Sequence, residues 1–153
     1  DEDADATRRM TLSRRELIDV DSSLSQLEQL IAEHAPLGPL VVGGFSQGGA
    51  MAQEMLQLPL ADRIVGVVAM GTRLVREMEL RLRLAELGPK HLFWMHGERD
   101  LRVSIQDGWA VAHVFESAGW AMELIEHPKG HMIPMEHHGA LKEWLTALSQ
   151  IRL

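Results

Sequence analysis

The sequence predicts an α/β fold in which a parallel β-sheet lies between two layers of helices. Four short apolar segments, each typical of a buried strand, alternate along the chain with longer amphipathic segments that are typical of helices. Strands that alternate with helices form parallel sheets, because each helix returns the chain across one face of the sheet. The chain has 153 residues, which is the length of one domain with its own core.

The chain is expected to begin with a flexible acidic lead-in, followed by a long helix. Residues 1–12 are mostly polar and charged, which favours a solvated segment ahead of a single folded domain over 13–153. Ser13 and Glu16 fit a capping box at a helix N-terminus. Apolar residues then recur every three or four positions, which predicts a helix over about 13–33.

The rest of the chain is divided by Pro and Gly into short strands and longer helices. Strands are predicted at 40–45, 64–70, 91–95 and 121–126. Helices are predicted at 48–58, where Pro59 ends the helix, and at 74–87, 107–118 and 136–149. On the last two helices, the residues expected to face the core are Trp109, Val111, Ala112, Val114 and Phe115, then Leu141, Trp144, Leu145 and Leu148.

Composition and charge exclude several classes of function. The formal net charge of -7 argues against nucleic-acid binding, which needs a basic surface, and against docking on an anionic membrane. The chain has no cysteine, so disulfides and thiolate metal sites are excluded, while the redox compartment stays open with a preference for the cytoplasm. No apolar run is long enough for a membrane span, and no signal peptide is visible.

A G-x-S-x-G sequence, Gly44 to Gly48, lies between the first predicted strand and the next helix. In this context it predicts a nucleophile elbow, a tight turn in which the serine has a strained backbone and needs small neighbours. Gly44 and Gly48 would allow the strand and helix to pack closely, and Ser46 would project above the carboxyl edge of the sheet. The backbone N–H of Gln47, at the helix N-terminus, is then the candidate oxyanion donor.

A serine nucleophile needs a base, and the base needs a carboxylate to orient it. Asp100 follows the third strand and is the candidate acid, with Glu98 as an alternative earlier in the same turn. His131 follows the fourth strand and is the candidate general base. The order Ser, Asp, His is the one that this elbow requires. The competing histidines are His127, His137 and His138.

Residues 127–138 are rich in histidine, which raises the question of a metal site. The segment has no H-E-x-x-H sequence and no cysteine, so neither a metal nor another cofactor is predicted. Met132 and Ile133, next to His131, are candidates for lining an acyl site, because flexible apolar side chains adapt to varied chains. The alternative is that both are core residues at the start of the last helix.

Three segments of the chain, 43–52, 96–103 and 130–131, resemble the phospholipase/carboxylesterase family, which includes acyl-protein thioesterases. The second segment is similar to that family's H-G-x-x-D-x-x-V pattern, with Leu101 where proline is common. The resemblance extends from about Ser13 onward and implies the carboxyl-terminal portion of an α/β-hydrolase three-layer sandwich. It further implies hydrolysis of carboxylic esters or thioesters through an acyl-serine, without a cofactor, on a small-molecule or acylated substrate.

The chain departs from the family in lacking the strands that come before its first helix. In the family, a loop of L-H-G type in that region supplies a second oxyanion N–H. The only His-Gly pair here, His96-Gly97, instead belongs to the segment that contains Asp100, which we call the acid loop. The strand at 40–45 should then have an exposed edge, so the chain alone is not expected to be a well-behaved monomer. Three explanations stay open: a separate or removed N-terminal segment, favoured by the start at Asp1; a second copy pairing at that edge; or an impaired remnant that acts as a binding or scaffold module. Hydrolysis of another carboxylic derivative, such as a lactone, is a further alternative.

Overall fold

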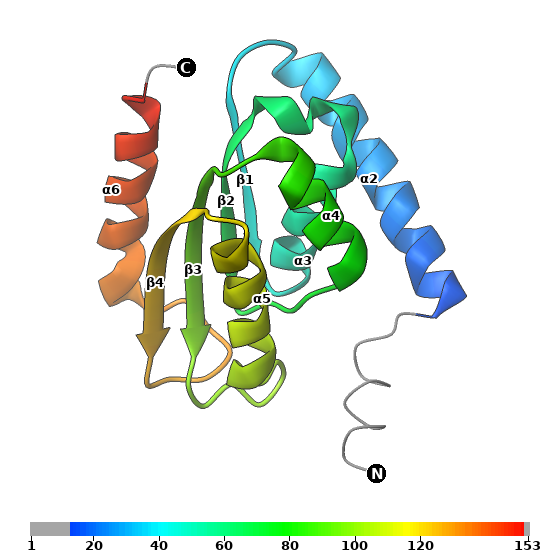
Figure 1. The fold of residues 1–153 in the computed structure, drawn as a ribbon. Helices are drawn as coiled ribbons and strands as arrows, with labels where there is room; N and C mark the ends of the chain where they lie inside the picture. Colours follow the sequence, from blue (N-terminus) through cyan, green and yellow to red (C-terminus); the bar gives the residue numbers. More distant parts are fainter. Residues whose placement is uncertain (1–12, 152–153) are drawn as a thin grey trace.

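The computed structural model describes residues 13–151 and has the predicted α/β architecture, a four-stranded parallel sheet with helices on both faces (Figure 1). The strand order is β1-β2-β3-β4, and all three strand pairs are parallel. The acidic lead-in predicted for residues 1–12 lies outside the described residues. The strands are β1 (Leu40–Phe45), β2 (Ile64–Met70), β3 (His91–Gly97) and β4 (Ala121–His127).

The strand predictions are confirmed, with small differences at two carboxyl ends. The first two strands have the predicted limits, whereas β3 continues two residues further than predicted and β4 one residue further. The longer strands bring the acid loop and the loop of His131 side by side at one edge of the sheet, since Gly97 is paired with His127.

Residues 13–151 contain five α-helices and three short 3₁₀-helices, which precede, connect and follow the strands. In Figure 1, α2 to α5 lie on one side of the sheet, whereas α6 lies alone on the other. The α-helices are α2 (Arg14–His34), α3 (Gln47–Glu54), α4 (Glu77–Leu87), α5 (Ile105–Ser117) and α6 (His138–Ser149). The 3₁₀-helices are η1 (Met55–Gln57), η2 (Pro59–Arg63) and η3 (Met135–His137).

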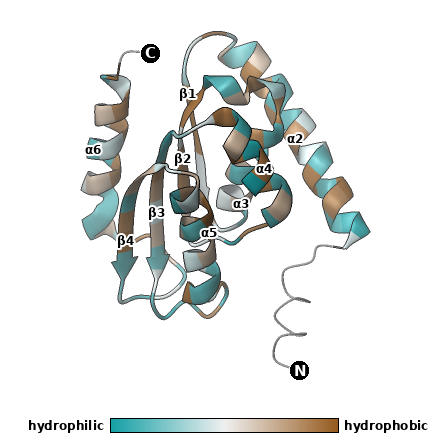
Figure 2. Ribbon diagram, in the orientation of Figure 1, coloured by the Kyte–Doolittle hydropathy of each residue, from teal (hydrophilic) through white to brown (hydrophobic). Residues whose placement is uncertain are grey.

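The strands separate two hydrophobic clusters because successive side chains point to opposite faces of a sheet. Val67 on β2 belongs to the larger cluster beneath α2 to α5, whereas its neighbour Val68 belongs to the smaller cluster beneath α6. Figure 2 shows the same distribution, with the most apolar ribbon in the strands. The rings of Phe93 and Trp144 meet edge to face, with 5.7 Å between centroids, and attach α6 to β3.

The capping box predicted at the start of α2 is confirmed. The N–H of Ser13 donates to the Glu16 carboxylate at 2.7 Å, and the N–H of Glu16 donates to Ser13 Oγ at 3.2 Å. The two reciprocal bonds satisfy N–H groups that a helix N-terminus otherwise leaves unpaired. The helix extends one residue beyond the predicted end, to His34.

The helix predicted at 48–58 is shorter than expected, and Pro59 begins a new element in addition to ending one. The α-helix ends at Glu54, and the chain tightens into η1. Leu58 is extended, with φ -76° and ψ 155°, as residues before proline usually are, because the proline ring disfavours helical backbone there. Pro59 then occupies the first position of η2, where a missing N–H costs no hydrogen bond.

Two later helices begin at other residues than predicted. The α4 helix begins at Glu77, three residues late, because Leu74 is buried in the core and Arg76 extends its side chain to Glu54. The α5 helix begins two residues early, because Ser104 Oγ accepts the N–H of Asp107 and caps it. The last predicted helix is divided into η3 and then α6.

Two apolar side chains that were predicted to face the core are exposed instead. Trp109 is 46% exposed, because its indole N–H reaches across to the Glu126 carboxylate on β4. Leu145 is 40% exposed, because it lines a cavity at the amino ends of the strands. Their neighbours Val111, Phe115 and Leu148 are buried as predicted.

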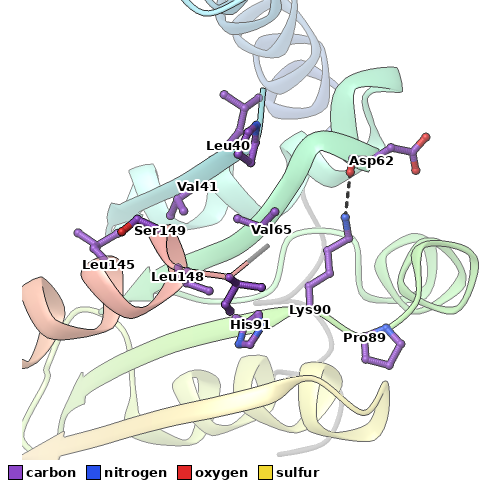
Figure 3. Close-up of a pocket in the computed structure, with 12 residues that line it drawn as sticks. Leu40, Val41, Asp62, Val65, Pro89, Lys90, His91, Leu145, Leu148 and Ser149 are labelled. Carbon is purple, nitrogen blue, oxygen red and sulfur yellow. Dashed lines mark hydrogen bonds between the residues drawn. The ribbon is translucent and has the colours of Figure 1, made fainter. Parts of the chain in front are cut away.

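The outer edge of β1 has no strand partner within residues 13–151, and Val41 on it is 38% exposed. A cavity of about 430 Å³ lies near the start of this strand, between the amino ends of the strands and the end of α6 (Figure 3). Lys90 closes one side of the cavity by donating to the carbonyls of Ala61, Asp62 and Ile64. No helix in the described part of the chain is long and apolar enough to span a membrane.

Candidate active site

Ser46 lies at the turn from β1 to α3 in the geometry expected of an elbow. Its φ of 57° and ψ of -117° are strained, and within residues 13–151 it is the only non-glycine residue with positive φ. Two neighbours hold this conformation. The N–H of Ser46 donates to the Met70 carbonyl at 2.8 Å, and Thr72 Oγ1 donates to the Ser46 carbonyl at 2.7 Å.

Close packing at the elbow depends on Gly44 and Gly49, whereas Gly48 has no steric need to be glycine. A Cβ on Gly44 would lie 2.4 Å from the Gly48 carbonyl carbon, so the strand could not approach the helix. A Cβ on Gly49 would lie 2.9 Å from both the Gly44 oxygen and Thr72 Cβ. A Cβ on Gly48 would meet no atom within 4 Å. The prediction that Gly48 is needed for close packing of the strand and helix is therefore wrong.

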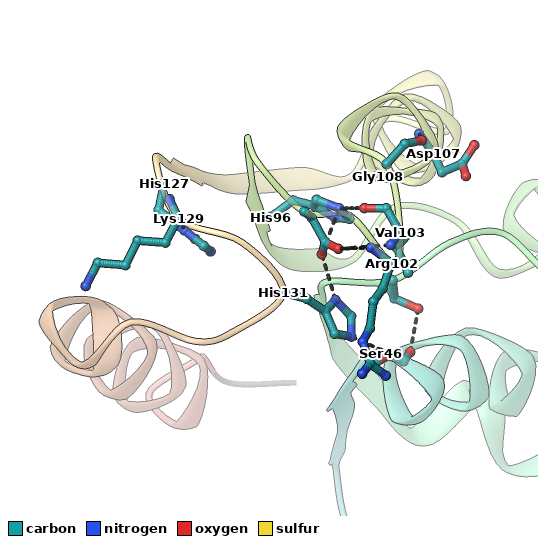
Figure 4. A network of polar contacts seen from close by, with 12 residues as sticks. Ser46, His96, Arg102, Val103, Asp107, Gly108, His127, Lys129 and His131 are labelled. Carbon is teal, nitrogen blue, oxygen red and sulfur yellow. Dashed lines mark hydrogen bonds and ion pairs between the residues drawn. The ribbon is translucent and has the colours of Figure 1, made fainter.

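Ser46, His131 and Asp100 come together at the carboxyl edge of the sheet, and Figure 4 shows the His131 ring pointing toward Ser46. His131 Nε2 lies 3.0 Å from Ser46 Oγ, and its Nδ1 lies 2.7 Å from Asp100 Oδ2. The other Asp100 oxygen accepts the backbone N–H groups of Arg102 and Val103, each at 2.9 Å. A hydroxyl, an imidazole and a carboxylate in this sequence of contacts can pass a proton from oxygen to nitrogen.

Two opposing effects act on the pKa of Asp100, and the hydrogen bonds prevail. Burial of this side chain, which is 7% exposed, would raise the pKa. The N–H of Val103, the ring of His131 and the N–H of Arg102 all stabilise the ionised carboxylate and hold the pKa below its ordinary value of 3.8. Asp100 is therefore an anion throughout the neutral range.

The loops that bear Asp100 and His131 are bonded directly to each other. The N–H of Glu98 donates to the His127 carbonyl at 2.8 Å, and the N–H of Arg99 donates to the Lys129 carbonyl at 3.1 Å. Gly97 makes this approach possible, since a Cβ there would lie 2.3 Å from the Gly130 carbonyl oxygen. The carboxylate and the imidazole are thereby held at a fixed separation.

Three further residues lie close to Ser46, His131 or Asp100 and were not predicted from the sequence as site residues. Thr72 and Gly71 follow β2 at the same sheet edge, and a Cβ on Gly71 would lie 2.6 Å from the Phe45 ring, which is itself 4.6 Å from the His131 ring. Their place after a buried strand was the available signal. His96 is 1% exposed, and its Nε2 lies 2.8 Å from the Val103 carbonyl and 3.6 Å from Asp100 Oδ2.

The alternative acid and bases lie elsewhere. Glu98 is exposed, and no hydrogen bond in residues 13–151 joins its carboxylate to a histidine. His127 is buried and accepts the N–H of Lys129 through Nδ1, and burial lowers the pKa of its ring. His137 and His138 lie in η3 and at the start of α6. In the described part of the chain, Ser46 Oγ is bonded to His131 alone.

A cleft of about 820 Å³ opens beside Ser46 and His131. Its walls come from α2, the elbow, the segment after β2, the acid loop and the start of α5. Gln47 lines it at the first position of α3, where a helix N–H has no partner within the helix. The full lining is Glu16, Asp19, Val20, Ser23, Ser46, Gln47, Ala50, Met51, Thr72, Arg73, Val75, Leu101, Arg102, Val103, Ser104, Asp107 and His131.

Met132 and Ile133 are not among the lining residues of the cleft. Ile133 packs against the hydrophobic cluster beneath α6, which was the alternative considered for it, and Met132 is 42% exposed. Across residues 13–151, no three His, Asp or Glu side chains are grouped so that they could hold a metal ion.

Comparison with known proteins agrees with this arrangement of elements. The sequence profile of the phospholipase/carboxylesterase family matches residues 2–149, which is nearly the whole chain. The chain belongs to the phospholipase/carboxylesterase family. A curated relative in this hydrolase family, acyl-protein thioesterase 1 of Neurospora crassa, is 29% identical over 128 residues. That alignment covers 78% of this chain and 50% of the relative, so the chain spans about half the length of this member of the family.

Solved structures similar to this member of the family have the α/β-hydrolase fold. SOBER1 of Arabidopsis thaliana has a TM-score of 0.70 and 22% identity, covering 88% of this chain and 64% of its own. Acyl-protein thioesterase 2 of Zea mays has a TM-score of 0.67 and 20% identity, covering 84% and 64%. At these identities the likeness supports the three-layer α/β fold alone, and the resemblance noted in the sequence is confirmed at the level of family and fold.

Proposed function

We propose that this chain is a serine hydrolase that cleaves carboxylic esters or thioesters through an acyl-serine intermediate. The observation that supports this most is the pair of contacts from His131, one to Ser46 Oγ at 3.0 Å and one to Asp100 Oδ2 at 2.7 Å. Family membership supports the reaction class, because a relative in the family is named an acyl-protein thioesterase. The substrate is a small or acylated molecule.

In the proposed mechanism, Ser46 is the nucleophile, His131 the general base and Asp100 the residue that orients it. His131 Nε2 takes the proton of Ser46 Oγ as the oxygen attacks the carbonyl carbon, and later donates it to the leaving oxygen or sulfur. Asp100 accepts a hydrogen bond from the Nδ1–H of His131 and stays ionised, which fixes the ring tautomer and stabilises the imidazolium. Water then hydrolyses the acyl-serine with the same base.

Gln47 is proposed as an oxyanion donor through its backbone N–H. Its support is that Gln47 directly follows the strained Ser46 and is the first residue of α3, where the N–H groups have no partner within the helix. The cytoplasmic location stays a prediction. Loss of one oxyanion donor costs about 2.7–4 kcal/mol of transition-state stabilisation, so a single donor would permit slow turnover.

A fluorophosphonate probe tests the proposed nucleophile, because it reacts with activated serines and needs no knowledge of the substrate. The folded chain should be labelled, and Ser46→Ala should abolish the label. Ser25→Ala is the matched control: Ser25 is an exposed serine on α2 that bonds to the Asp21 carbonyl, and its loss should leave labelling intact. A folded chain that is not labelled would favour the binding or scaffold module.

The outer edge of β1 is proposed to pair with another strand, from a separate N-terminal segment or from a second copy. Its support is the exposed Val41 and the lack of a strand partner for β1 within residues 13–151. Sedimentation at micromolar concentration should show self-association of the chain. A cooperative monomer in that experiment would contradict the proposal.

A further inference from the structure

Arg102 is a cation in the catalytic cleft that the proposed reaction does not use. It lines the same cleft as Ser46 and His131, and Figure 4 shows its side chain running from the acid loop toward Ser46. Its backbone N–H donates to Asp100 Oδ1 at 2.9 Å. The backbone of Arg102 is therefore held by the same carboxylate that contacts His131.

The guanidinium of Arg102 has no hydrogen-bond or ion-pair partner among residues 13–151, and the residue is exposed to the cleft. An arginine that stabilises a fold usually has a carboxylate or carbonyl partner, as Arg76 has Glu54 and Arg63 has the Ala35 carbonyl. Arg102 differs from both in offering its donors to the space beside the nucleophile.

Charges around the cleft restrict where an anion could bind. Glu16, Asp19 and Asp107 line the walls formed by α2 and α5 and would repel an anion there. Arg73 also lines the cleft, but its charge is partly offset by Glu16, whose pKa is lowered by hydrogen bonds from Ser13 and also by Arg73. The space beside Ser46, at Arg102, is thus the favourable place for negative charge in a chain whose net charge is -7.

We propose that Arg102 forms an anion subsite, so that the preferred substrates are esters or thioesters bearing a carboxylate or phosphate of their own near the scissile carbonyl. This inference rests on the proposed hydrolysis at Ser46. The planar guanidinium fork matches both kinds of anion and binds them through two parallel hydrogen bonds. The anion supplies the partner that the guanidinium of Arg102 lacks among the described residues.

The same guanidinium is poorly suited to the other role open to it, stabilising the oxyanion of the reaction. Oxyanion donors act because they are held in place before the reaction begins. The Arg102 head group is held by nothing in residues 13–151, so it would have to be ordered at the moment of reaction. A substrate anion instead orders the side chain on binding, before the chemical step.

The first test compares Arg102→Gln with the parent chain on matched substrates. The substrates are 4-nitrophenyl half-esters of straight-chain diacids and the 4-nitrophenyl esters of the same length that end in a neutral carboxamide. The ratio of kcat/KM on the anionic substrate to kcat/KM on the neutral one should fall on the order of tenfold or more in Arg102→Gln. This fall is expected because the variant loses a charge-assisted hydrogen bond to the substrate anion. Arg99→Gln is the matched control, since Arg99 is exposed on the same loop and does not line the cleft.

A second arm places the anion on the leaving group, with the acetyl thioesters of 3-mercaptopropionate and of 3-mercaptopropionamide as the charged and neutral members. The arm in which Arg102→Gln loses selectivity identifies the side of the scissile bond that bears the anion. Added salt should lower the same ratio in the parent chain, because it screens the pairing of charges. An unchanged ratio in both arms would overturn the proposal, as would an equal loss on charged and neutral substrates, which indicates an oxyanion role.

A readout without turnover separates this inference from the proposed function. Calorimetric titration with free suberate should show binding to the parent chain and to Ser46→Ala, and clearly weaker binding to Arg102→Gln. If no substrate is hydrolysed but suberate binds through Arg102, the proposed hydrolysis fails and the subsite stands. If esters are hydrolysed and Arg102→Gln changes neither selectivity nor suberate binding, the subsite fails and the hydrolase stands.

Discussion

Asp100 Oδ2 and His131 Nδ1 lie 2.7 Å apart, although 31 positions separate the two residues in the sequence. The contact exists because β3 and β4 are adjacent parallel strands, and the loops that follow them leave the same edge of the sheet. The geometry of this pair leads to the first two predictions.

Asp100→Asn should reduce kcat on a neutral ester by about four orders of magnitude, because an amide no longer fixes the tautomer of His131 that accepts the Ser46 proton. The amide oxygen can still accept the N–H groups of Arg102 and Val103, so the loop should keep its shape. Steady-state kinetics measure the loss. Glu98→Gln, which changes the exposed carboxylate two positions earlier, should have little effect, and a larger loss in it than in Asp100→Asn would make Glu98 the acid.

The ionised form of Asp100 should stabilise the fold in a pH-dependent way. Its pKa is lower in the folded chain than the ordinary 3.8, so the stabilisation is complete above that pH and is lost as the pH falls through the folded pKa. Urea unfolding of the parent chain and of Asp100→Asn, compared from neutral to acidic pH, measures this contribution. The difference in unfolding free energy should shrink below pH 3.8, and a constant difference would contradict the assigned direction.

The two elbow glycines should respond differently to a methyl group. Gly44→Ala should destabilise the chain by about 1–3 kcal/mol, because its Cβ would lie 2.4 Å from the backbone of Gly48. Gly48→Ala has open space around its Cβ and lies in α3, where alanine is favoured over glycine by up to about 1 kcal/mol. Thermal unfolding of both variants tests the pair, and equal destabilisation would refute the packing described for the elbow.

Gly97→Ala should reduce activity more than its effect on stability explains. The new Cβ would press on the Gly130 and Lys129 carbonyls and shift the loop of His131 away from Asp100. Misplacement of a catalytic group by about 1 Å can cost on the order of a hundredfold in rate. Kinetics and unfolding are measured together, with Gly139→Ala as a control whose Cβ meets no atom within 4 Å. A variant that unfolds normally and keeps its activity would show that the contact between the loops is not needed.

The sequence predicted the fold well where local chemistry determines structure. The capping box at Ser13 set the start of α2, and uninterrupted apolar runs set the limits of β1 and β2. It was less informative where distant residues compete. The start of α4 depends on Arg76 reaching Glu54 on α3, and the exposure of Trp109 depends on Glu126 on β4, two contacts that no local pattern contains.

The candidate site was predictable to the extent that strand order places loops at one edge. That rule predicts that Ser46, Asp100 and His131 lie together. In the structure, His131 is within hydrogen-bond distance of both Ser46 and Asp100. The rule could not supply side-chain directions. Ile133, a candidate for the acyl site with a core position as the alternative, packs on the α6 face, whereas Arg102, which was not singled out, lines the cleft.

The central claim, that Ser46 forms a covalent acyl intermediate, is tested most directly with a 4-nitrophenyl carbamate. A carbamoyl-serine hydrolyses slowly, so the intermediate should accumulate and remain on the chain for peptide mass spectrometry. The account predicts one carbamoyl group per chain, on the peptide that contains Ser46, with stoichiometric release of 4-nitrophenolate and no adduct in Ser46→Ala. An unmodified Ser46 peptide in a folded chain, or a carbamoyl group on another residue, would contradict it.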